Sequence, residues 1–172
     1  MENGVVEVLT APELNLQDVV SLKYKVASDE SEFAALETFA GDYESVSKVI
    51  PAAEQVLRKG VVELLMGEIK TAAEILKSET LAVSKNYYVQ SLIALGERSS
   101  ARKVLAGVVS DLSAASQDLK LELAISAMHL SELDLLNQVV TSLDMDALGA
   151  MGTFLNACQK ELDGDYQGAI DG

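Results

Sequence analysis

The stretch VQSLIALGERSSARKVLAGV, residues 89–108, decides the fold. Val89, Leu92 and Ile93 follow one another at three- and one-residue steps, as on one face of an α-helix, and lead into Gly96. Helical spacing of apolar residues restarts beyond this glycine, at Ala101, Val104, Leu105 and Val108. Residues 89–108 therefore predict a helix, a short turn and a second helix.

A second stretch, residues 119–143, has the same organisation. Apolar residues recur up to a break at Ser131-Glu132 and then resume as far as Leu143. They are Leu119, Leu121, Leu123, Ile125 and Leu130 before the break, and Leu133, Leu136, Val139, Val140 and Leu143 after it. Because the chain also has only two prolines, Pro12 and Pro51, helices are expected almost everywhere. The sequence predicts an all-α fold of antiparallel helix pairs.

The breaks between helices form an internal repeat. Each has glycine or serine followed by an acid: Gly41-Asp42-Tyr43, Gly67-Glu68-Ile69, Gly96-Glu97-Arg98, Ser131-Glu132-Leu133 and Gly164-Asp165-Tyr166. Glycine can close a helix in the left-handed conformation, and an acid can cap the next helix and face its positive end. We therefore expect a helix to end and another to begin at each break.

Mostly small residues lie at fixed distances from these breaks. Five positions after each break stand Val46, Ala72, Ala101, Leu136 and Ala169, and seven positions before it stand Ala34, Gly60, Val89, Ala124 and Ala157. Small side chains on both helices of a pair let their backbones approach closely. The pattern predicts tightly packed helix pairs.

These breaks and their flanking residues resemble those of tetratricopeptide (TPR) repeats. The resemblance is carried by Gly41-Asp42-Tyr43 and Gly164-Asp165-Tyr166 with their small and apolar neighbours, which look like the turn between the two helices of that family. Successive breaks are 26, 29, 35 and 33 residues apart, whereas a TPR repeat has about 34, so the repeats are degenerate. The resemblance implies a TPR-like α-solenoid over residues 30–172.

Residues 1–29 lie outside the repeat pattern, and we assign them to an N-terminal cap or arm. Leu16, Val19, Val20 and Leu22 predict a capping helix before the polar link at residues 28–31. A short extended segment around Val5–Leu9 is the alternative for the first residues.

The composition limits the partners. The net charge is −14, and residues 104–172 hold 11 acids against Lys120 and Lys160, so nucleic acid is excluded as a partner and a protein with a basic surface is expected. Acidity that only maintains solubility is the alternative explanation.

Cys158 is the one cysteine, next to Ala157 and near Phe154, and we expect it to be a buried small residue. A single cysteine indicates a reducing compartment, and we expect the cytoplasm. No signal peptide or membrane insertion is expected.

Catalytic and cofactor sites are not expected, so we predict a binding protein rather than an enzyme. His129 is the only histidine and is expected to interact with the last carbonyls of its helix, not to form a pair with Cys158. The segment Gly96–Lys103 lacks the Gly-Lys-Ser/Thr ending of a phosphate loop. Residues 163–171, DGDYQGAID, match a calcium loop at several positions but lack its final glutamate, so a helix turn is preferred, with Tyr166 and Ile170 facing inward near Ala157.

The family resemblance places a partner groove on the first helices of the pairs. The candidate groove residues are the polar ones on otherwise apolar helices: Asn86, Gln90, Asp118 and His129. The sequence thus predicts a protein–protein interaction scaffold or adaptor. The alternatives are a self-assembling structural module, in which the last helix is covered by a second copy, and a C-terminal calcium-loop protein.

Overall fold

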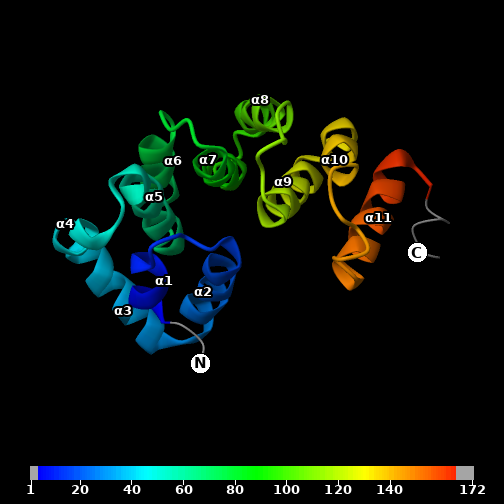
Figure 1. The fold of residues 1–172 in the computed structure, drawn as a ribbon. Helices are drawn as coiled ribbons and strands as arrows, with labels where there is room; N and C mark the ends of the chain where they lie inside the picture. The colour runs from blue at the N-terminus through cyan, green and yellow to red at the C-terminus, as the bar shows by residue number, and fades with distance from the viewer. Residues whose placement is uncertain (1–3, 166–172) are drawn as a thin grey trace. The chain divides into compact units, whose positions relative to one another are not determined.

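A computed structural model describes residues 4–165, and every regular element in that range is helical, which confirms the all-α prediction. The α-helices are α1 Val5–Thr10, α2 Leu16–Ser28, α3 Glu30–Gly41, α4 Tyr43–Val46, α5 Gln55–Leu65, α6 Ile69–Leu76, α7 Ala82–Ala94, α8 Arg98–Val109, α9 Gln117–Leu130, α10 Leu133–Val140 and α11 Ala150–Asp163 (Figure 1). Two 3₁₀ turns, Ser47–Val49 and Ala52–Glu54, join α4 to α5. None of the helices within residues 4–165 could cross a membrane.

The chain forms two compact units, Met1–Ser91 and Leu92–Gly172. Helix α7 spans the boundary between them. In the first unit, α1 packs against α2 and α3, α3 packs against α5, and α5 pairs with α6. In the second unit, α9 pairs with α10, α8 packs against both, and α10 packs against α11.

The N-terminal residues are helical from Val5 onward. The helix predicted around Leu16–Leu22 is confirmed as α2. Asn15, the residue before it, caps the helix, since its side chain accepts hydrogen bonds from the N–H groups of Gln17 and Asp18. Asp29 then caps α3 by accepting from Ser31. The alternative of an extended segment around Val5–Leu9 is wrong, because these residues form α1.

Helix α1 is held at both ends by charged side chains from other helices. At its start, the Glu32 carboxylate on α3 accepts a hydrogen bond from the Val5 N–H at 3.2 Å. At its C-terminal end, the Arg58 guanidinium on α5 donates to the carbonyls of Leu9, in the last turn, and of Ala11, just beyond the helix, at 3.0 and 2.6 Å. An anion at the N-terminus and a cation at the C-terminus of a helix both complement its dipole. These tertiary contacts explain how a six-residue helix persists, since so short a helix is unstable alone.

Four of the predicted breaks share one backbone structure. After α5, the N–H of Gly67 bonds to the Leu64 carbonyl and that of Glu68 to the Glu63 carbonyl, at 3.1 and 2.8 Å. This is the Schellman motif, in which the first residue beyond the helix adopts positive φ. The same bonds follow α7, α9 and α11, and the left-handed residues are Gly67, Gly96, Ser131 and Gly164. The predicted role of glycine is therefore confirmed at three breaks, and at the fourth a serine takes the conformation.

Two details of the predicted breaks are wrong. The acids Asp42, Glu68, Glu97 and Glu132 do not cap the next helix through their side chains. Instead, the Glu68 backbone supplies the carbonyl that accepts from Ala72, so the acid position starts the helix through its main chain. The first break also differs: Gly41 is the last residue of α3 and has no positive φ, and the Asp42 N–H bonds back to Thr38.

Small residues permit close packing in the α5–α6 pair. A Cβ added to Gly60 would lie 2.5 Å from Cγ of Leu76, and Ala72 is fully buried. Ala101, Ala124 and Val89 are also fully buried. The pattern fails at Ala34, which is exposed on α3, and Ala157 is only half-buried. Ala169 lies outside the described residues.

Candidate partner-binding surfaces

The two predicted groove residues on α9 lie on one side of that helix but far apart along it. Asp118 is in the first turn and His129 in the last, eleven residues apart. At 3.6 residues per turn this separation is close to three whole turns, or about 16 Å along the axis. His129 is exposed and Asp118 is half-buried. The two side chains are therefore separate points on one helix face, and they do not converge on a shared ligand atom.

The two candidates on α7 differ in exposure. Gln90 is half-buried, whereas the side chain of Asn86 is fully buried, one turn before it, and its amide has no hydrogen-bond partner. The expectation that Asn86 stands on an outward face is therefore wrong. Helix α7 has buried residues on several of its sides, namely Ser84, Tyr87, Val89, Ser91 and Leu92. A polar residue on this helix therefore does not mark an exposed face.

Two bases of the second unit, Arg102 and Lys120, take part in structural contacts. The Lys120 ammonium on α9 donates to the Ser142 carbonyl at 3.0 Å, just beyond α10, and thereby complements the C-terminal end of that helix. The Arg102 guanidinium on α8 lies 3.0 Å from the Glu132 carboxylate in the α9–α10 turn. The segment Gly96–Lys103 is thus a Schellman turn followed by the first part of α8, as its lack of a phosphate-loop ending suggested.

Cys158 is half-buried on α11. The prediction that it is a buried residue is wrong. Burial, and secondarily the nearby Glu161 carboxylate, raise the pKa of its thiol. Because a thiolate is the reactive form of cysteine, this environment disfavours nucleophilic chemistry at neutral pH. Among the described residues, no three His, Cys, Asp or Glu side chains are grouped so that they could hold a metal ion.

The candidate calcium segment begins at the end of α11. Asp163 is the last residue of that helix, and Gly164 follows in the left-handed conformation with φ 84°. The Asp165 N–H bonds to the Lys160 carbonyl at 2.8 Å, which completes a Schellman motif. The helix-closing role of Gly164 is confirmed. The predicted positions of Tyr166 and Ile170, and the rest of the calcium-loop pattern, lie outside the described residues.

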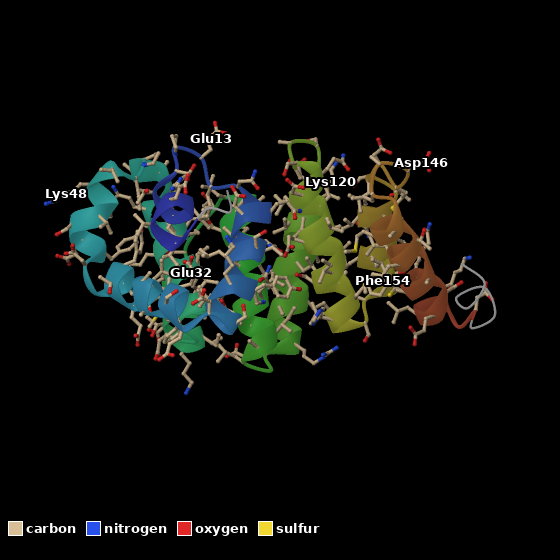
Figure 2. All side chains as sticks on the ribbon, turned by 90° about the horizontal axis from the view of Figure 1, so that it is seen from below. Glu13, Glu32, Lys48, Lys120, Asp146 and Phe154 are labelled. Carbon is tan, nitrogen blue, oxygen red and sulfur yellow. The ribbon has the colours of Figure 1, made fainter. Side chains whose placement is uncertain are left out.

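Helix α11 carries an exposed apolar surface that the sequence analysis missed. Phe154, labelled in Figure 2, is an α11 residue. It is 51% exposed and Met151 39% exposed, whereas Leu155 is fully buried. The inward face of α11 is the one that carries Leu155 and Gly152, both buried. The three- and four-residue spacing of apolar residues on α11 was visible, but spacing alone does not tell which side another helix covers.

No protein-family model matches the chain, and neither a curated protein sequence nor a solved structure shows significant similarity to it.

Proposed function

We propose that this chain is a protein–protein interaction scaffold built from degenerate TPR-like repeats, stacked as an α-solenoid behind an N-terminal cap at residues 1–29. In this proposal the chain binds other proteins and does not catalyse a reaction. The cytoplasm, or another reducing compartment, is the proposed location.

One observation carries the proposal, the repetition of the same helix-closing turn. The Schellman motifs at Gly67, Gly96, Ser131 and Gly164 use the same two backbone hydrogen bonds, and the helices around Gly67 and Ser131 are packed as pairs. A chain of similar helix pairs is the unit from which helical-repeat proteins build extended binding surfaces. This supports binding through a surface that several helices share.

The exposed and half-buried polar residues predicted on the first helices are the proposed partner contacts. These are Gln90 on α7 and Asp118 and His129 on α9; the buried Asn86 is no longer among them. Side chains on the same side of a helix, as Asp118 and His129 are, can contact one extended peptide segment together. The surplus of acids in residues 104–172 favours a partner with a basic surface, which would associate faster at low salt.

The test is affinity capture with the intact tagged chain from a cell extract, followed by identification and purification of the retained protein. Its binding is then measured against a variant carrying Gln90→Ala, Asp118→Asn and His129→Ala. Gln138→Ala, an exposed amide on the second helix α10, is the matched control.

The proposal expects the triple variant to bind the purified partner at least about tenfold more weakly, while the Gln138→Ala variant binds as the parent does. Failure to retain any protein, together with turnover of a small molecule by the purified chain, would refute the scaffold. Light scattering over a concentration series tests the self-assembly alternative, since a mass that stays monomeric argues against it.

A further inference from the structure

Helix α11 packs on α10 through a defined side. Leu155 is fully buried there, and the Gln159 side-chain amide donates to the Asn137 side chain on α10. Gly152 lies against the loop before the helix, where an added Cβ would be 2.4 Å from the Met145 carbonyl oxygen. These contacts fix the rotation of α11 about its axis, and so they determine which residues remain accessible.

An apolar stripe runs along the accessible flank of the same helix. Met151, Phe154 and Cys158 follow one another at three- and four-residue spacing, so they lie on one face and span two turns, or about 10 Å. Phe154 is 51% exposed. Among the large apolar side chains of the described residues, only those of Tyr24, Val49 and Val6 are more exposed. Large aromatic side chains are the residues that most often anchor protein interfaces.

One acidic residue continues this stripe toward the C-terminal end of α11. Glu161 lies three residues beyond Cys158 and so on the same side of the helix. Asp163 and Lys160, also in the last turn, lie on other sides of the helix. The C-terminal end of a helix carries a partial negative charge, so carboxylates there are unfavourable unless a cation approaches. The face therefore combines an apolar part with an end that would be stabilised by a positive charge.

We propose that the α11 face, formed by Met151, Phe154, Cys158 and Glu161, docks a basic amphipathic helix of another protein. The apolar side of that helix covers Met151 and Phe154, and a lysine or arginine lies over Glu161. This inference rests on the proposed scaffold function and names the chemistry of its partner.

The charge of residues 104–172 favours such a partner over a second copy of the chain. Residues 104–172 hold 11 acids and two bases, so two copies meeting at this face would bring like charges together. The same charge opposes docking on an anionic lipid surface. A helix with lysines or arginines around an apolar stripe complements both parts of the face.

The probe is a synthetic fluorescent peptide of about 18 residues, with leucines at helical spacing on one side and lysines on the other. A second peptide replaces the lysines by glutamates. Binding of each to the full chain is measured by fluorescence anisotropy at two salt concentrations. The basic peptide is expected to bind and the acidic peptide is not.

Two pairs of variants locate the binding. Phe154→Ser should weaken binding of the basic peptide by about tenfold or more, because an anchoring aromatic side chain is lost. Tyr24→Ser is its control, because Tyr24 is 72% exposed on α2 and its loss should leave binding unchanged. Glu161→Gln should weaken binding about threefold at low salt, mainly through slower association, whereas Glu74→Gln on α6 should not.

The proposal is overturned if the basic peptide does not bind, if both peptides bind equally, or if Phe154→Ser and Tyr24→Ser have equal effects. Light scattering that shows a dimer lost only in Phe154→Ser would assign the face to a second copy instead. Capture experiments with the intact chain distinguish failure of this inference from failure of the proposed scaffold function. Retention of that partner by Phe154→Ser leaves the scaffold standing and removes the α11 face, whereas capture of no protein by the parent chain counts against the scaffold.

Discussion

Replacing Arg58 by alanine should destabilise the first unit, because this side chain is fully buried and charged. Its guanidinium donates to the carbonyls of Leu9 and Ala11 and forms an ion pair with Glu54, one turn earlier on the chain. Alanine would leave two carbonyls at the C-terminal end of α1 without their donor and the Glu54 carboxylate without its cation. Helix α1 would also lose the positive charge at its C-terminal end.

The size of the effect follows from these contacts. Hydrogen bonds from a charged donor contribute about 1.5–3 kcal/mol each, and removing one member of a buried ion pair costs about 3–5 kcal/mol. The contributions overlap, and the Glu54 side chain is 25% exposed, so water can partly solvate it after the change. We therefore expect a loss of about 3–4 kcal/mol in the free energy of unfolding.

Urea unfolding followed by circular dichroism measures this loss. With an m-value of about 2 kcal/mol/M, the midpoint of the transition that reports the first unit should fall by about 1.5–2 M. Because the chain has two compact units, the transitions of the two can separate, and hydrogen exchange identifies the affected one. The amides of Val8 and Leu9 in α1 should lose protection in Arg58→Ala.

Arg102→Ala is the matched control. The Arg102 side chain is 64% exposed and forms a surface ion pair with Glu132, so its removal should cost less than about 1 kcal/mol. Arg58→Met tests the role of the charge, since methionine retains much of the apolar stem without a donor. Equal midpoint shifts for Arg58→Ala and Arg102→Ala, or unchanged protection of α1, would refute the reasoning.

Three further predictions concern single residues. Gly60→Ala should destabilise by about 1–3 kcal/mol because the new methyl meets Leu76, whereas Gly107→Ala on α8, with nothing within 4 Å, should stabilise by about 0.5–1 kcal/mol; thermal unfolding of both variants checks the opposite signs. Ser131→Gly should stabilise by about 1 kcal/mol because it relieves a φ of 58° in a non-glycine residue, and an unchanged urea midpoint would contradict this. Burial raises the pKa of Tyr43, so the folded state holds that proton more tightly than the unfolded state. Its stabilising contribution should be complete below about pH 10 and be lost as the pH rises through the folded pKa, a loss that Tyr43→Phe should remove from unfolding curves measured at alkaline pH.

The turns between helices could be predicted from the sequence because their cause is local. A glycine placed where a run of apolar spacing stops can adopt positive φ at no steric cost, and Gly67, Gly96 and Gly164 do so. The serine at position 131 was found through the acid that follows it and through the position of the break. The role of the acids could not be predicted in the same way, because side-chain capping depends on backbone angles that the Schellman turn does not provide.

The contacts of α1 could not be predicted, because their cause is tertiary. Arg58 stands between Leu57 and Lys59 on α5, and nothing near it in the sequence indicates that its partners are the carbonyls of Leu9 and Ala11, 49 and 47 residues earlier. Val5, Val8 and Leu9 are consistent with either a short helix or an extended segment. The choice is made by Glu32 and Arg58, which satisfy the two ends of the helix.

The same distinction between local and tertiary causes explains the outcome at the candidate surface. Polar residues were selected on α7 and α9 on the assumption that they mark an outward face. A helix with buried residues on several of its sides has no single outward face, and Asn86 on α7 is buried. On α11 the reverse holds, since Phe154 is apolar and exposed. Periodicity identifies which residues share a face, whereas the packing of Leu155 and Gln159 on α10 decides which face remains open. A binding surface in a protein of helix pairs therefore depends on the rotation of each helix against its neighbour, and Phe154→Ser tests whether the face that this rotation leaves open on α11 binds a partner.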